Sequence, residues 1–184
     1  MLRLAMADEP AQDLVIHHPN REKGGSKATK AGTILLLLAS AVLVAIVTIG
    51  GWADLEGAKV ISIFFILVFL LIAFFVARWS RGVLPLSAAF AIVLLVFAAI
   101  AAPGWFDRDA TGYDNPGLPP GLLGLLTVIL IPVEFLLIVF AMRGFSQKWN
   151  VEIEMTREEY DRRHRGNGGN GGRGYQYAQP QAKA

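Results

Sequence analysis

Residues 121–142 read GLLGLLTVILIPVEFLLIVFAM, and the rest of the chain is best interpreted from this stretch. As a helix it rises about 30 Å, which matches the hydrocarbon core of a bilayer. Pro132 and Glu134 are the only proline and the only charged residue well inside a long apolar stretch. Because a carboxylate is costly in lipid, we expect Glu134 to face protein or water, or to hold a proton.

Three further stretches share this character, and they cover residues 31–52, 60–79 and 84–102. Charged residues occur only at their ends, and none shows the polar face that a water-soluble bundle needs. The predicted fold class is therefore an all-α membrane protein. Its four-span transmembrane helix bundle covers residues 31–143, with 121–142 as the fourth span.

The distribution of Lys and Arg predicts the orientation of these spans. The loops after the first and third spans contain only Lys59 and Arg108, among several acidic residues. Basic residues cluster instead before the first span, between the second and third, and after the fourth: Arg21, Lys23, Lys27, Lys30, Arg78, Arg81, Arg143 and Lys148. The positive-inside rule then places both termini in the cytoplasm, in a multi-pass protein of the cell membrane. The span ends carry Trp52, Trp79, Trp105 and Trp149, which are expected at the lipid–water interface.

The segments outside the spans are polar. Residues 1–30 form a cytoplasmic N-terminal segment without a cleavable signal peptide, which starts at Met1 or Met6. Residues 21–30 are predicted to be a flexible basic linker. Residues 103–120 are rich in Gly, Pro and Asp and are expected to be irregular, with one interfacial turn at Trp105 and Phe106.

A strand and a short helix are predicted for the cytoplasmic residues 144–165. Residues 149–155 alternate apolar and polar side chains, and residues 13–17 form a short strand-like run. We expect these strands to pair antiparallel, with Val15 near Ile153. Such pairing would draw the first and fourth spans together. Thr156 and Glu159 fit a capping box that opens a helix over residues 157–165. The Gly-rich tail, residues 166–184, is predicted to be disordered.

Glu134 is the main candidate for a functional residue. On a helix it shares one small, polar face with Pro120, Gly124, Thr127 and Ala141, which should face other protein helices. Pro132 leaves the carbonyl of Val128 without its helical partner. Ser40 lies at the depth of Glu134 in the first span, so we predict a hydrogen bond between them. The intramembrane candidates are thus Glu134, Pro132, Thr127 and Ser40. Their role is structural, proton- or ion-coupled, or a contact to a partner subunit.

The outer loop contains a partial cation-binding motif. Asp107, Asp109 and Thr111 occupy ligand positions of a calcium loop, but Leu118 stands where the bidentate glutamate belongs. We expect this segment to be an ordinary solvated loop. Cysteine is absent, and His17, His18 and His164 lack metal-site spacing, so no metal and no cofactor are predicted.

No catalytic constellation is visible, so the chain is not expected to be an enzyme. A net charge of +2 gives no reason to expect a nucleic-acid partner. The predicted function is a non-enzymatic accessory, scaffold or assembly subunit of a membrane complex, in contact with the lipid bilayer and with a membrane-protein partner or further copies of itself. The alternative is a small oligomeric transporter or channel in which Glu134 is the proton- or ion-coupled residue.

Overall fold

The computed structural model describes residues 14–108 and 117–166 of the protein. The chain divides into two compact units, one formed by residues 18–151 and a smaller one to which residues 14–17 and 152–166 belong. Several predictions concern residues outside the described ranges. These are the start at Met1 or Met6, the roles of Asp109 and Thr111, and the disordered tail beyond Gly166.

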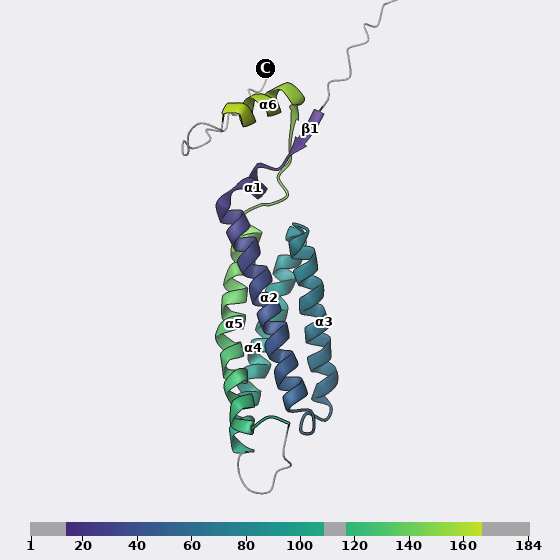
Figure 1. The fold of residues 1–184 in the computed structure, drawn as a ribbon, viewed down its shortest axis with the longest axis vertical. Coiled ribbons are helices and arrows are strands. Elements are labelled where there is room, and N and C mark those ends of the chain that lie inside the picture. Colours follow the sequence, from purple (N-terminus) through teal and green to yellow (C-terminus); the bar gives the residue numbers. More distant parts are fainter. Residues whose placement is uncertain (1–13, 109–116, 167–184) are drawn as a thin grey trace, which may run out of the picture. The chain divides into compact units, whose positions relative to one another are not determined.

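Four long helices build the larger unit: α2 (Gly24–Gly50), α3 (Ala58–Ala77), α4 (Leu84–Asp107) and α5 (Pro120–Ser146) (Figure 1). The short helix α1 (Pro19–Glu22) precedes α2, and the 3-10 turn η1 (Arg81–Val83) leads into α4. At 1.5 Å per residue the long helices rise about 30–40 Å. Each is long and apolar enough to cross a membrane, as the sequence predicts.

The outward faces of these helices are apolar. Leu35, Ile49, Val60 and Ile100 are between 66% and 74% exposed, and they come from three different helices. Exposed apolar area of this extent is unfavourable in water and favourable in lipid. The absence of a polar outer face, inferred from the sequence, is therefore seen in the packed bundle.

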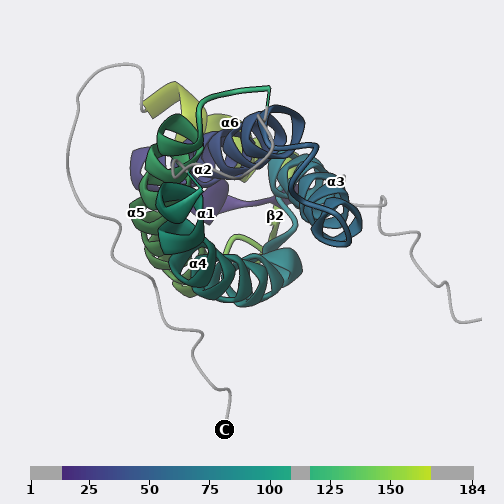
Figure 2. The same cartoon turned by 90° about the horizontal axis from the view of Figure 1, so that it is seen from below.

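The helices pack in the order α3–α2–α5–α4 around the bundle (Figure 2). Consecutive helices run antiparallel, and α2 packs extensively against both α3 and α5, while α4 packs most extensively against α5. The predicted adjacency of the first and fourth spans is therefore confirmed. In contrast, the backbones of α3 and α4 seldom approach closely, although these helices are consecutive in the chain. Aromatic side chains bridge this α3–α4 seam, where the ring of Phe65 packs edge-on against those of Phe90 and Phe97 with centroids 6.0 Å apart.

The two ends of the bundle differ in charge. The basic end holds the starts of α2 and α4 and the ends of α3 and α5, together with Lys30, Arg78 and Arg81. The acidic end holds the other helix termini, with Asp54 and Asp107.

The buried residues of α5 recur every three or four positions: Leu123, Thr127, Leu130, Glu134, Leu137, Ala141 and Gly144. This seven-residue repeat is the pattern of helices packed knobs-into-holes. It confirms that Thr127, Glu134 and Ala141 face the bundle interior, as predicted. Small residues on the same helices accept large side chains. A Cβ atom on Gly124 would lie 2.8 Å from the ring of Phe106, and one on Gly32 would clash with Phe140.

Two helix boundaries differ from the predictions. Residues 24–30 are not a flexible linker, because α2 begins at Gly24 and buries Ser26 and Thr29. Gln147 Nε2 donates a hydrogen bond to Thr29 Oγ1 at 2.9 Å, so a contact distant in sequence holds this turn in place. Likewise α4 continues through Pro103 to Asp107, where an irregular loop was expected. The burial of Trp105 against the bundle extends the helix past that proline.

The smaller unit contains a two-stranded antiparallel sheet, formed by β1 (Leu14–His17) and β2 (Ile153–Thr156), and the helix α6 (Arg157–Gly166). The predicted antiparallel pairing is therefore confirmed. The capping contact is also present, since Thr156 Oγ1 accepts a hydrogen bond from the backbone N–H of Glu159 at 3.4 Å. The ring of His17 packs edge-on against that of Tyr160, with centroids 5.7 Å apart.

The register and the length of the second strand differ from the prediction. Val15 pairs with Met155, and Ile153 pairs with His17. The strand also begins at Ile153 instead of Trp149, because the preceding residues form a turn. Lys148 takes a left-handed conformation with φ 49°, and its carbonyl accepts a hydrogen bond from Val151 N at 3.2 Å.

Candidate functional site

Glu134 lies near the middle of α5 and is fully buried. In the described residues of the four long helices it is the only acidic or basic side chain away from the helix ends. The seven-residue repeat of α5 places it on the face that packs against α2 and α4. The sequence therefore predicts both its isolation and its inward orientation correctly.

Ser40 of α2 is the polar neighbour of Glu134. The antiparallel pairing of α2 with α5 sets this level, because Gly32 meets Phe140 toward one end and Gly50 meets Leu123 toward the other. Midway between these contacts the Ser40 hydroxyl lies beside the Glu134 carboxyl group. Both residues are 0% exposed. The predicted juxtaposition is therefore present.

The two side chains are close enough to interact, as predicted, but not in the geometry of a well-formed hydrogen bond. Among the described residues, Ser40 Oγ and the two carboxyl oxygens of Glu134 have no hydrogen-bond partner besides one another. Ser40 and Glu134 thus form a small polar island inside an otherwise apolar layer.

Pro132 is not part of this island. Its side chain is exposed on the outward face of α5, as is Val128, whose carbonyl the proline leaves without a helical partner. Helix α5 nevertheless continues without interruption from Pro120 to Ser146. Pro132 and Glu134 therefore place their side chains on different faces of α5, because they are two residues apart along a helix.

Thr127 faces inward but serves a different region. Its hydroxyl donates a hydrogen bond to the carbonyl of Leu123 in its own helix, at 2.8 Å. It lies two helical turns from Glu134, toward the acidic end. The structure therefore separates Thr127 from the Ser40–Glu134 pair and places it on the wall of a cavity.

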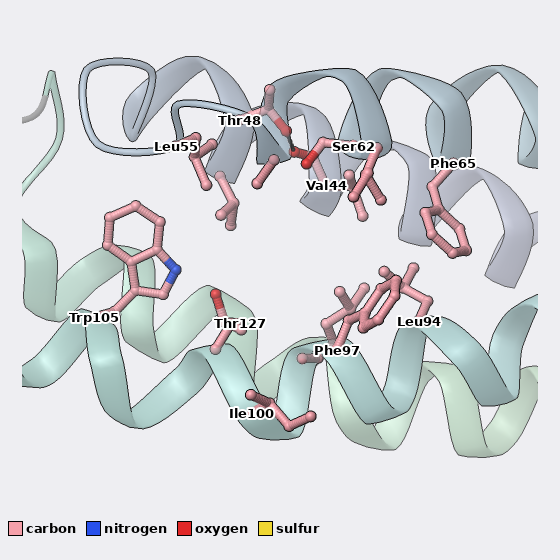
Figure 3. A pocket seen from close by; sticks show the side chains of 16 residues that line it. Val44, Thr48, Leu55, Ser62, Phe65, Leu94, Phe97, Ile100, Trp105 and Thr127 are labelled. Carbon is pink, nitrogen blue, oxygen red and sulfur yellow. Dashed lines mark hydrogen bonds between the residues drawn. The ribbon is translucent and has the colours of Figure 1, made fainter.

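This cavity is a feature that sequence reasoning missed. It has a volume of about 300 Å³, lies in the half of the bundle nearer the acidic end, and receives side chains from all four long helices (Figure 3). Most of its lining is aliphatic or aromatic, including Val44, Phe65, Leu94 and Phe97. Leu130 lines it but Glu134, one turn further along α5, does not. No sequence signal could have revealed it, because an apolar side chain beside a cavity looks the same as one in a packed core.

The outer-loop motif is only partly described. Asp107 is the last residue of α4, so it is helical where a calcium loop would need an irregular backbone. Within residues 14–108 and 117–166, no group of three or more His, Cys, Asp and Glu side chains is arranged to hold a metal ion. The described part of the motif therefore gives no support to a cation site.

A second missed feature is the aromatic and cationic cluster at the basic end. Trp149 is 0% exposed and packs edge-on against Trp79, with ring centroids 5.4 Å apart. The Lys30 ammonium lies 4.1 Å from the centre of the Trp79 ring. Trp149 Nε1 donates to Gln147 Oε1 at 2.9 Å. Trp149 and Trp105, which the sequence predicts at the lipid–water interface, therefore have side chains buried in the protein, and Trp105 is 3% exposed.

Arginine side chains complete this cluster by binding carbonyl groups after the end of α5 and at its last turn. Arg21 Nε donates to Trp149 O at 3.0 Å, and Arg81 Nε donates to Phe145 O at 2.7 Å. Such bonds satisfy carbonyls that a helix C-terminus leaves without partners, and cations are favoured there. From the sequence, Arg21 and Arg81 indicate only the orientation of the spans in the membrane. The structure shows that they also fix the packing of the basic end.

The comparisons give no relative from which a role for these residues could be transferred. No protein-family model, no curated protein and no solved structure matches the chain.

Proposed function

We propose that this protein spans a membrane four times, with its basic end in the cytoplasm. Its four helices have the length and apolar surface for that role. The clustering of Arg and Lys at one end supports the orientation, because cytoplasmic loops carry an excess of these residues. Both β1 and β2 adjoin helix ends at the basic end in the sequence, so the termini would also be cytoplasmic.

Within that membrane, we propose a non-enzymatic role as an accessory, scaffold or assembly subunit. The observation that carries this proposal is the separation of the buried acid from the cavity. Glu134 has Ser40 as its polar neighbour, and the cavity wall ends one turn away at Leu130. A transport path would need polar groups in series, and among the described residues the long helices provide no second titratable group at that depth.

The competing function is transport by an oligomer in which Glu134 exchanges a proton or binds an ion. One observation favours it: both carboxyl oxygens of Glu134 are buried and without hydrogen-bond partners. Costly intramembrane acids are often retained for function. This candidate ranks second because the Glu134 side chain is enclosed by α2, α4 and α5 instead of lining the cavity.

Purification of the tagged full-length chain from its native membrane, in a mild detergent, separates the two functions. Co-purification of a different membrane protein in constant ratio supports the subunit role. A homo-oligomer without other proteins, which carries protons across reconstituted vesicles and loses this activity on Glu134→Gln, contradicts it. Ser146→Ala is the matched control, because that hydroxyl is exposed and bonds only within its own helix.

A further inference from the structure

The cavity opens on the outer surface of the bundle. Ile61 of α3 and Ile100 of α4 both line it, and their side chains are 48% and 72% exposed. Phe65 and Leu94 line its inner wall and are only 3% and 7% exposed. The cavity therefore leads from exposed side chains to buried ones. Its walls include both helices of the α3–α4 seam, where the backbones are well separated and side chains such as Phe65 and Phe97 fill the space between them.

We propose that this cavity binds one acyl chain of a membrane phospholipid, which enters sideways from the bilayer through the α3–α4 seam. The proposal rests on the membrane location proposed above. It adds a ligand class and a site to that location, and it applies equally to a subunit and to a transporter.

The chemistry of the walls favours an apolar occupant. The hydroxyls of Thr48 and Thr127 donate hydrogen bonds to carbonyls of their own helices, at 2.6 and 2.8 Å. Ser62 and the indole of Trp105 supply the other polar groups of a lining that is otherwise hydrocarbon (Figure 3). Among the residues that the structure describes, none of those lining the cavity is charged. An apolar cavity offers water too few hydrogen-bond partners to hold it. A void left unfilled would lose the dispersion contacts of its walls, so a hydrocarbon chain stabilises this half of the bundle.

The dimensions match one leaflet. The walls extend from Ala58 to Phe65 on α3, a rise of about 10 Å, and from Trp105 to Leu94 on α4, a rise of about 16 Å. Half of a bilayer's hydrocarbon core is about 15 Å. The cavity therefore accommodates a chain from the leaflet at the acidic end and stops near the middle of the membrane.

Two cations lie at the acidic end of the bundle, among the acidic residues Asp54, Glu56 and Asp107. Lys59 follows the lining residue Ala58 in the sequence, and the Arg108 guanidinium lies 4.7 Å from the ring centre of Trp105, which lines the cavity. Among the described residues at the acidic end these are the only Lys and Arg side chains. Every phospholipid carries a phosphate, and basic residues near the membrane surface attract it.

Photolabelling tests this site directly. The full-length protein is reconstituted in phosphatidylcholine vesicles that contain phosphatidylcholine with a diazirine in one acyl chain, illuminated, and analysed by peptide mass spectrometry. We expect label on Phe65 and Leu94, which are buried, as well as on Phe64 and Val93, which are exposed at 50% and 44%. Lipids that only surround the bundle would label the exposed residues Phe64 and Val93 and leave Phe65 and Leu94 unlabelled.

Cavity-filling variants supply the matched control. Ala98 is buried in the cavity wall, Ala101 lies nearer the surface of the same wall, and Ala99 is exposed and does not line the cavity. Ala98→Phe and Ala101→Phe should each lower the labelling of Phe65 and Leu94 about tenfold, by occupying the space of the chain. Ala99→Phe should leave it unchanged. Ala101→Phe decides the result if Ala98→Phe does not fold.

The outcomes separate this proposal from the membrane proposal. Label on Phe64 and Val93 without label on Phe65 and Leu94 overturns the lipid site and leaves the membrane location intact. If the exposed pair also stays unlabelled, the membrane location itself fails. If Ala101→Phe instead changes the oligomeric state while the buried pair remains unlabelled, the seam is an interface with a second copy and the lipid site is wrong.

Discussion

Val15 lies directly opposite Met155 in the antiparallel pair of β1 and β2. Cβ atoms of opposed residues in such a pair are about 4.5–5.5 Å apart, whereas a shift of two residues gives roughly 7–8 Å. We therefore expect cysteines at Val15 and Met155 to form a disulfide readily on mild oxidation. The natural chain has no cysteine, so the introduced pair forms the only disulfide possible within the chain.

Cysteines at Val15 and Ile153 are the control for this register. They should crosslink more slowly, because Ile153 pairs with His17. Gel mobility with and without reductant measures both rates. Faster crosslinking of the control pair would contradict the register.

The sheet also shows how far the sequence could predict the structure. The alternation of apolar and polar residues reveals the second strand, but it also includes Trp149, which belongs to the basic end of the bundle. The turn at Lys148 interrupts the pattern, and a positive φ at a lysine leaves no sequence signal. Element type was therefore predictable, and the strand boundary was not.

In the candidate site, too, some features were predictable from the sequence and others were not. Apolar length and the spacing of Thr127, Glu134 and Ala141 predict the buried face of α5, because helical periodicity is a local property. Equal depth predicts Ser40 beside Glu134. The cavity and the cluster around Trp149 depend on which helices meet and how tightly, and that information is not local.

Removal of the Trp149 side chain should destabilise the protein strongly. The side chain is fully buried, and Trp→Ala at such a site costs about 3–5 kcal/mol in free energy of unfolding. Trp52→Ala is the control, since Trp52 is 50% exposed and should lose less than about 1 kcal/mol. Denaturant unfolding in one detergent compares the two. A loss of less than about 1 kcal/mol for Trp149→Ala would contradict a stabilising role for its packing.

Arg81→Lys tests the carbonyl contacts at the end of α5. Arg81 donates to Phe145 O and, at 3.1 Å, to Asn150 Oδ1, and a lysine cannot reproduce this fork. We expect a loss of about 1–2 kcal/mol in unfolding free energy with no change of charge. Arg78→Lys, at a side chain that stacks on Phe74, should cost less. If both changes cost the same, the hydrogen bonds of Arg81 are not the cause.

Glu134→Met should leave the free energy of unfolding unchanged or raise it by roughly 1–3 kcal/mol, because it removes two buried oxygens without hydrogen-bond partners. Ser40→Ala alone should change stability by about 0.6 kcal/mol or less. The double variant should show a coupling of about 0.5 kcal/mol or more, because the two side chains are neighbours. A marked destabilisation by Glu134→Met would reveal a stabilising contact of the carboxyl group.

Reporter fusions test the proposed orientation. Gly82 is exposed between α3 and α4, with no atom within 4 Å of an added Cβ, so an insertion there is expected to be tolerated. A reporter at Gly82 and one after Lys183 should both read cytoplasmic, and one at Thr111 should read external. Opposite readings for Gly82 and Lys183 would exclude the four-span topology.

The hydrogen bond from Asn20 to the carbonyl of Lys148 joins residues 128 positions apart, one before the first long helix and one after the last. At 5–20 residues per second, a ribosome needs roughly 6–25 s to make the chain between them. During that interval every long helix must leave the ribosome while Asn20 and Arg21 have no carbonyl to bind. Closure of the basic end is therefore a late step in biosynthesis, and it takes place only on chains whose last helix has been completed.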